Sequence, residues 1–237
     1  MPTRKKNRQN DELREIKITK NYLNKIPSSV LVEFGDTKVL CTATFEQKQP
    51  AFLADTTKGW VTAEYSMLPA STRPRSQRER NKINARNQEI QRLIGRALRG
   101  IININKLNST SITIDCDVLQ ADGGTRTASI TGAYISLYLT LKEMLAQGII
   151  DTIPLSDSIS AVSIGIIGKN IMTDLDYDED SKADVDMNFV ITGSGKMVEV
   201  QGTAEHNPFT KEQLDEMYLH ASSACEKLKE LQKTVLE

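Results

Sequence analysis

Asp117-Val-Leu-Gln-Ala-Asp-Gly-Gly-Thr-Arg-Thr-Ala-Ser-Ile-Thr-Gly132 joins a predicted strand to a predicted helix. Residues 111–119 carry an apolar side chain at every second position, the pattern of a strand with one buried face. The predicted helix covers 127–147, and Gly148 stands where a C-terminal cap glycine belongs. We therefore expect a mixed α and β fold whose central connection turns at Gly123-Gly124.

The turn itself predicts an anion site. Gly123 and Gly124 precede Thr125, which we expect at the N-cap, and Arg126, which we expect in the first helical turn. Paired glycines before a helix let several backbone N–H groups converge, and the helix dipole and the guanidinium add positive charge there. We expect a phosphate at this point. The alternative is a purely structural turn in which the glycines only permit positive φ.

The rest of the chain predicts two successive series of strands, each followed by helices. The first series places strands near 13–19, 28–34, 38–45, 60–65 and 111–119, with helices around 90–101 and 127–147. A second series follows near 159–167, 171–175, 187–192 and 196–201, and the capping box Thr210-Lys-Glu-Gln213 opens the last helix. This order predicts an α+β fold with two domains, 1–150 and 151–237.

Composition limits the classes of function. The 237 residues have a formal net charge of −1, so any affinity for nucleic acid must come from a local patch. No apolar run approaches the roughly 20 residues of a membrane span, and the N-terminus lacks a secretory signal. Three scattered cysteines without C-x-x-C spacing predict reduced thiols in a cytoplasmic protein. The presence of only two histidines argues against a Ser-His triad or a zinc site.

The local patch is basic. The segment 73–99 contains only two acidic residues but nine basic ones, which are Arg73, Arg75, Arg78, Arg80, Lys82, Arg86, Arg92, Arg96 and Arg99. Its first half holds Pro74 and few apolar residues, so we expect an exposed loop that follows an RNA backbone. The alternative is a solvated charged loop. We expect Arg92, Arg96 and Arg99 to be structural or to lie at a subunit interface.

An acidic segment places seven carboxylates within residues 174–186. An EF-hand loop that starts at Asp174 is excluded, because it would need Gly at its sixth position and Glu at its twelfth. This sequence has Glu179 and Val185 there. Asp186 directly precedes a predicted strand and should therefore be fixed at a sheet end. Clustered carboxylates suit Mg²⁺, and a solvated acidic loop is the alternative.

Six blocks of sequence resemble one family in order along nearly the whole chain. The blocks cover 29–43, 59–69, 89–99, 120–133, 179–188 and 198–205, and the most specific is Gln120-Ala-Asp-Gly-Gly-Thr-Arg-Thr-Ala-Ser-Ile-Thr-Gly-Ala133. The chain resembles the ribonuclease PH family of bacterial phosphorolytic exoribonucleases, which are relatives of polynucleotide phosphorylase and of exosome ring subunits.

The resemblance implies a fold, an activity and site residues. The fold would be a ribosomal-protein-S5-domain-2-like β-α core followed by a smaller α/β half, assembled as a homo-hexamer, a trimer of dimers. The activity would be that of a tRNA nucleotidyltransferase that trims 3′ ends of tRNA precursors, with rRNA as a second substrate and inorganic phosphate as co-substrate. The residues implied are Arg86, Gly124, Thr125 and Arg126 for phosphate, Arg75 and Arg78 for RNA with Arg73 adding charge, and Asp180 and Asp186 as catalytic pair and Mg²⁺ ligands.

This chain departs from the family pattern at three places. Ala70 stands where the family usually has arginine, the stretch between Glu79 and Arg86 is about two residues short, and Arg4-Lys-Lys-Asn-Arg8 replaces a usual Arg-x-Asp-Gly-Arg. These changes affect the expected RNA affinity more than the chemistry. They keep open a non-catalytic RNA-binding ring subunit of the same fold, whereas a hydrolytic nuclease would have no use for the predicted phosphate site.

Overall fold

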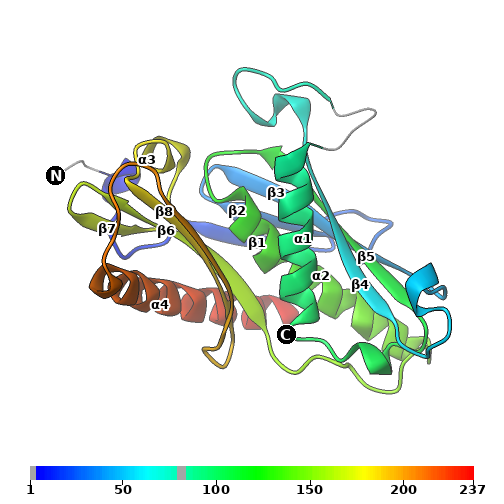
Figure 1. Cartoon of the computed structure of the whole chain (residues 1–237). Coiled ribbons are helices and arrows are strands. Elements are labelled where there is room, and N and C mark those ends of the chain that lie inside the picture. The colour runs from blue at the N-terminus through cyan, green and yellow to red at the C-terminus, as the bar shows by residue number, and fades with distance from the viewer. Residues whose placement is uncertain (1–3, 79–83) are drawn as a thin grey trace.

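The part of the chain that the structure describes forms two β-sheets, with helices between and beside them (Figure 1). The computed structural model describes residues 4–78 and 84–237. The first sheet has the order β1-β2-β3-β5-β4 and the second the order β7-β6-β8-β9. The strands are β1 (Ile16–Lys20), β2 (Val30–Phe34), β3 (Thr37–Glu46), β4 (Trp60–Met67), β5 (Ser111–Gln120), β6 (Ile159–Ile167), β7 (Asn170–Thr173), β8 (Val185–Thr192) and β9 (Met197–Ala204).

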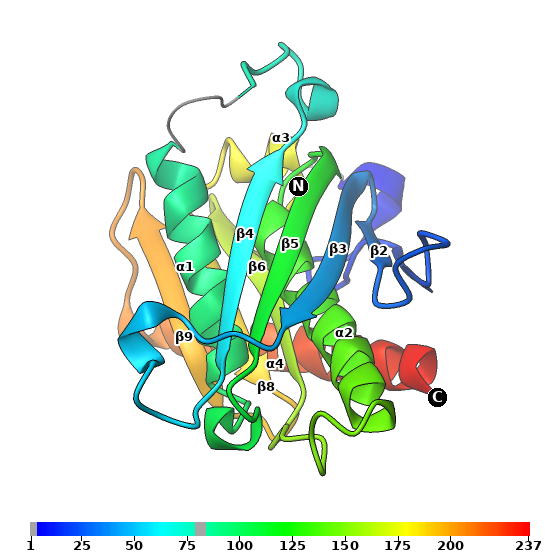
Figure 2. The same cartoon turned by 90° about the vertical axis from the view of Figure 1, so that its right-hand side faces the viewer.

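The first sheet confirms the alternation predicted for its central strand. In β5, Ile112 and Ile114 are fully buried, whereas Thr113 and Asp115 are only half-buried on the opposite face. β5 pairs antiparallel with β3 and parallel with β4. Figure 2 shows these strands side by side, with α1 and α2 behind them. One face of this sheet is therefore packed against helices and the other is open, which explains the period of two.

Within the described residues the chain also forms four α-helices, namely α1 (Ala85–Arg99), α2 (Thr125–Ala146), α3 (Tyr177–Asp180) and α4 (Lys211–Leu236). Helix α2 packs against β2, β3 and β5 of the first sheet and against β6 of the second. It therefore lies between the sheets, and its buried hydroxyls satisfy backbone groups, as when Ser136 donates to the Ser28 carbonyl at 2.7 Å. The predicted capping box Thr210–Gln213 is confirmed at the start of α4.

The α+β prediction is confirmed, and the differences are local. Strand β7 ends at Thr173 rather than at residue 175, because Asp174 has a φ of +55° and turns the chain away. Ile159 and Ala161 of β6 belong to the same buried apolar cluster as the first sheet, so the core continues across the connection. The boundary between residues 150 and 151 stays a prediction. Within the described residues, no helix is long and apolar enough to span a membrane.

Candidate active site

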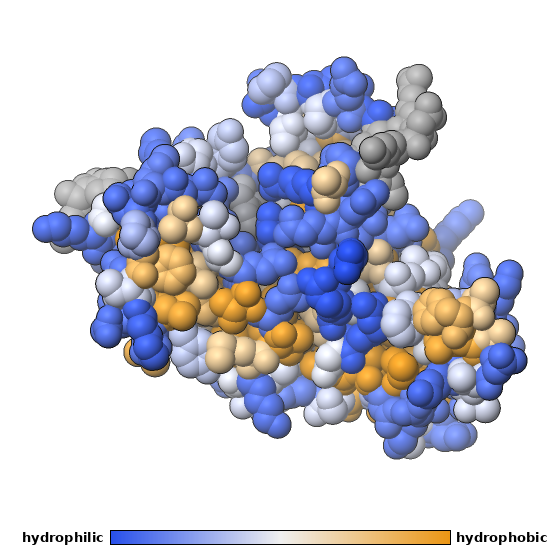
Figure 3. Space-filling view, in the orientation of Figure 1, coloured by the Kyte–Doolittle hydropathy of each residue, from blue (hydrophilic) through white to orange (hydrophobic). Residues whose placement is uncertain are grey.

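A cleft of about 430 Å³ opens at the end of the molecule where β5 meets α2. Its walls come from both sheets and from the segment after β4, and seven of the predicted site residues line it: Arg73, Arg86, Gly124, Thr125, Arg126, Asp180 and Asp186. Figure 3 shows a mainly hydrophilic surface over the upper part of the face seen in Figure 1, with hydrophobic residues gathered lower down. The fold thus brings together the anion, acidic and part of the basic predictions.

The Gly123-Gly124 turn is shaped both by its backbone and by its neighbours. The φ angles are +75° and +63°, a region that side chains disfavour. A Cβ atom on Gly123 would also lie 2.5 Å from the Leu175 carbonyl oxygen and 2.9 Å from the Tyr177 nitrogen. The glycines therefore do more than permit a turn: they let the end of β5 press directly against the segment that leads into α3.

The predicted N-cap is wrong by one residue. Gly124 occupies the N-cap of α2 and Thr125 is the first helical residue. The Thr125 hydroxyl lies 2.8 Å from the hydroxyl of Tyr65, a buried side chain of β4, instead of capping the backbone. Among the residues that the structure describes, no side chain caps the start of α2 at Gly124. The first turn of α2 lines the cleft, where its N–H groups are suited to bind an anion. Tyr65 was missed, although it stands in one of the matched blocks, because alternation alone assigns it to the core.

Two arginines supply positive charge from different helices. Arg126, in the first turn of α2, places Nη1 3.3 Å from Gln201 Oε1 and 3.6 Å from Glu89 Oε1. Arg86 is exposed in the first turn of α1. The charges of both arginines favour ionisation of the two aspartates across the cleft. The two arginines and the two aspartates therefore line one cleft and interact electrostatically across it.

The two aspartates differ in environment. Asp186 lies within β8, which begins one residue earlier than Asp186 rather than after it, and its Oδ1 is buried without a hydrogen-bond partner among the described residues. Burial, and then the charge of Asp180, raises the pKa of Asp186 to about 6. Asp180 is exposed at the end of α3, yet desolvation of its carboxyl by the cleft raises its pKa against the charges of Arg86 and Arg126.

The other carboxylates of the acidic segment have structural partners. Asp174 is completely buried, and Glu179 accepts from Arg4 at 2.7 Å and from Arg8 at 3.0 Å. Asp176 caps α3 and forms a capping box with Glu179. The acidic residues therefore do not form one cluster. Some belong to a buried ionic network, and the Asp180–Asp186 pair faces the cleft.

Residues 4–14 hold the two sides of the cleft together, and we call them the N-terminal clamp. Arg14 donates to both oxygens of Asp174 at 2.7 and 3.0 Å and to the Asp122 carbonyl at 2.6 Å. Arg4 reaches the Thr173 carbonyl at 2.7 Å as well as Glu179. The clamp thus ties the glycine turn to the segment that carries α3. The departures from the family pattern in this region, Lys6 and Asn7, both adopt positive φ.

The three arginines predicted to bind RNA do not all lie at the cleft. Arg73 lines the cleft, whereas Arg75 and Arg78 are exposed on the segment after β4 and do not line it. This segment extends beyond the ends of the sheets at the top of Figure 1. The residues Glu79, Arg80 and Lys82, and most of the shortened stretch, lie outside the described residues. Of the helix arginines, Arg96 pairs with Glu199, and Arg99 lies 4.5 Å above the Trp60 ring, as expected for structural roles.

The Asp180–Asp186 pair fits a hard cation. Within the described residues no group of three His, Cys, Asp or Glu side chains forms a metal cage. A pair of carboxylates suits Mg²⁺, which keeps several waters and takes phosphate oxygens as its remaining ligands. The buried Oδ1 of Asp186, which lacks a partner among residues 4–78 and 84–237, is the atom that such an ion would satisfy. Buried Asn188 and exposed Tyr177 also line the cleft and were not predicted as site residues.

Comparison with known proteins gives one consistent result. The model of the 3′ exoribonuclease family, domain 1, matches residues 12–143, and that of domain 2 matches residues 157–224. Ribonuclease PH of Syntrophomonas wolfei is 50% identical over 98% of both chains, and that of Moorella thermoacetica is 52% identical over 95% of this chain and 91% of its own.

Solved structures agree on the fold. The exosome of Archaeoglobus fulgidus with RNA bound to its active site has a TM-score of 0.81 at 22% identity, covering 97% of this chain and 92% of that chain. An archaeal exosome core has a TM-score of 0.77 at 22% identity, covering 95% of this chain and 89% of that chain. The chain therefore belongs to the 3′ exoribonuclease family and has the two-part α+β fold of ribonuclease PH.

Proposed function

We propose that the protein shortens the 3′ ends of tRNA precursors, and of rRNA, by phosphorolysis and releases nucleoside diphosphates. The observation that carries this proposal is the contact between an anion-binding turn and a segment that bears carboxylates. Gly123 approaches Leu175 and Tyr177 so closely that no side chain fits, and Asp180 follows within one helical turn. A hydrolytic nuclease needs a carboxylate site but no second anion site beside it.

The geometry supports the following division of work. Gly124, Thr125, Arg126 and Arg86 hold inorganic phosphate, and an oxygen of that phosphate attacks the last phosphodiester of the RNA. The bond from phosphorus to the 3′-oxygen of the penultimate nucleotide breaks as the new phosphoanhydride bond forms, and the 3′-oxygen takes up a proton. Such a transfer needs positioning and charge neutralisation, which forked arginines provide. Because an anhydride replaces a diester, the reaction also runs in reverse as nucleotide addition.

Asp180 and Asp186 are the catalytic pair in this proposal. They would hold Mg²⁺, which neutralises charge on phosphate oxygens when bound. The raised pKa of Asp186, about 6, also lets this carboxyl carry a proton near neutral pH and pass it to the leaving 3′-oxygen. The two roles are alternatives, because a bound cation would hold the carboxyl ionised and lower its pKa. The unsatisfied Oδ1 supports the metal role and the raised pKa of the metal-free carboxyl supports the proton role, and activity measured against pH with and without Mg²⁺ separates them.

Binding of the longer RNA falls to the segment after β4. Arg73 stands at the cleft and Arg75 and Arg78 stand further out, so the three can follow successive phosphates toward the site. We further propose that the chain works as a homo-hexamer, a trimer of dimers, in the cytoplasm. This assembly is supported by the exosome cores that share its fold.

A tRNA with a 3′ extension, incubated with and without inorganic phosphate, tests the function. Shortened tRNA and nucleoside diphosphates should form only with phosphate, and nucleoside monophosphates in phosphate-free buffer would overturn the proposal. RNA binding without any product in either buffer would instead favour the non-catalytic ring subunit.

A further inference from the structure

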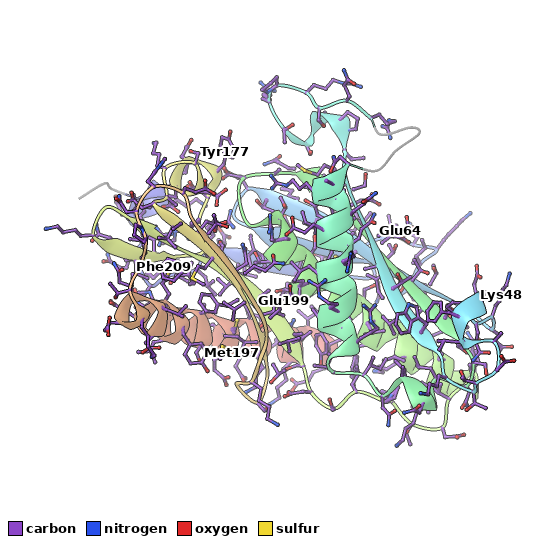
Figure 4. The ribbon with its side chains drawn as sticks, in the orientation of Figure 1. Lys48, Glu64, Tyr177, Met197, Glu199 and Phe209 are labelled. Carbon is purple, nitrogen blue, oxygen red and sulfur yellow. The ribbon has the colours of Figure 1, made fainter. Side chains whose placement is uncertain are left out.

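Tyr177 is a large aromatic residue that does not belong to the hydrophobic core. It is the first residue of α3, lines the cleft and is 63% exposed. Figure 4 labels it on α3, at the same end of the molecule as the segment that follows β4. One exposed aromatic residue is ordinary on a protein surface, but this one lines the same cleft as the predicted phosphate and carboxylate residues.

The backbone of Tyr177 is fixed against the predicted phosphate site. Its N–H donates to Asp122 Oδ1 at 3.3 Å, and its nitrogen is one of the atoms that leave no room for a Cβ on Gly123. The capping box of Asp176 and Glu179 holds the short helix. Asp180 lies three residues further along α3, on the same helical face. The backbone of Tyr177 is therefore fixed beside the anion turn, at the start of the helix that ends with Asp180.

The cleft also has apolar wall that phosphate alone does not require. Met67 at the end of β4 and Pro74 line it together with the ring of Tyr177. Inorganic phosphate and a hydrated metal ion bind to charges and N–H groups. An RNA 3′ end brings one further group into the cleft, the base of its last nucleotide, which has two flat apolar faces.

We propose that Tyr177 stacks on the base of the 3′-terminal nucleotide and so holds the last phosphodiester between the phosphate turn and the aspartate pair. This inference rests on the proposed function. Stacking on a ring tolerates every base, because each base has a π face, and an enzyme that removes nucleotides one after another needs that tolerance. The same contact would hold the nucleoside diphosphate product and its counterpart in the reverse reaction.

Two variants separate stacking from other roles. Tyr177→Ala should raise the KM for RNA by roughly tenfold or more, as expected when one base–aromatic stack is lost. Tyr177→Phe keeps the ring and should recover the affinity that the alanine variant loses. The KM for phosphate should change by less than about twofold in either variant, because the anion turn is made by other residues. Tyr22→Ala, which removes an aromatic residue that is 46% exposed and does not line the cleft, is the matched control.

A direct probe of the contact is an RNA whose 3′-terminal base is 2-aminopurine. Its fluorescence should be quenched on binding to the wild-type protein in EDTA, and much less on binding to Tyr177→Ala. Unchanged KM and quenching in Tyr177→Ala, a phenylalanine variant as weak as the alanine one, or a parallel rise in the phosphate KM would each overturn the stacking role. Wild-type protein that degrades RNA without phosphate would refute the proposed function instead, so the two failures are distinguishable.

Discussion

Replacing Asp186 with asparagine should stabilise the metal-free protein while it abolishes turnover. The carboxyl pKa rises from an ordinary 3.8 to about 6, because the group is buried and stands near Asp180. That rise corresponds to about 3 kcal/mol of unfavourable free energy for the ionised form in the folded protein. Water in the cleft screens part of it, so Asp186→Asn should gain about 1–3 kcal/mol of unfolding free energy at pH 8.

The sign of the effect gives a second check. Between its unfolded and folded pKa values, Asp186 binds more protons in the folded protein than in the unfolded chain, so wild-type stability falls as pH rises from about 4 to about 6. The advantage of Asp186→Asn should therefore largely disappear at pH 4. Urea unfolding of both proteins in EDTA at pH 4 and pH 8 measures it. The exposed Asp178→Asn, a control of the same chemistry, should stay within about 0.5 kcal/mol of wild type at either pH.

Three results would refute this reasoning about Asp186. A variant less stable than wild type at pH 8 would mean that the carboxylate has a favourable partner in the folded protein. A gain that is equal at both pH values would mean that ionisation is not its cause. A variant that loses RNA binding but retains turnover would remove Asp186 from the chemistry altogether.

Further substitutions test the turn, the arginine fork and the RNA path. Gly123→Ala should reduce activity at least about 100-fold and destabilise the protein by about 1–3 kcal/mol, because its Cβ would meet the Leu175 carbonyl. The control Gly148→Ala, at positive φ in open space, should lower only the melting temperature. Equal activity of the two variants would contradict the proposed role of the Gly123 turn. Arg126→Lys loses the forked donor and should raise the phosphate KM about tenfold; an unchanged KM would place phosphate elsewhere. Ala70→Arg should steepen the salt dependence of tRNA binding by about 0.7 to 0.9 in logarithmic slope, with the phosphate requirement intact; unaltered binding across the titration would turn this position away from RNA.

Local patterns predicted the elements of the fold well where one face of an element is buried. The alternation in β5 and the capping box of α4 are examples, because each depends on neighbours within a few residues. The start of α2 was misplaced for the opposite reason. Thr125 has the chemistry of an N-cap, but its hydroxyl is taken by Tyr65, which lies 60 residues away in the chain.

The acidic segment shows the same limit at the site. Composition identifies seven carboxylates but not which of them already have cationic partners. Asp174 and Glu179 are neutralised by Arg14 and Arg4 from the beginning of the chain, and no spacing rule connects residues so far apart. The family resemblance predicts Asp180 and Asp186 as site residues, whereas no pattern predicts Tyr177, because it is a single aromatic residue in a polar segment.

The N-terminal clamp has a consequence for the order in which the chain becomes native during synthesis. Arg4 and Glu179 are separated by 175 positions, and Arg14 and Asp174 by 160. At about 5–20 residues per second, the clamp arginines wait roughly 10–35 s on the ribosome before their acidic partners are made. Until then the glycine turn can form, but α3 has not yet been made and the clamp arginines have no acidic partner to bind. The first described residues to leave the ribosome are thus among the last to reach their native contacts, and a nascent chain gains its complete site only after most of its second half has been translated.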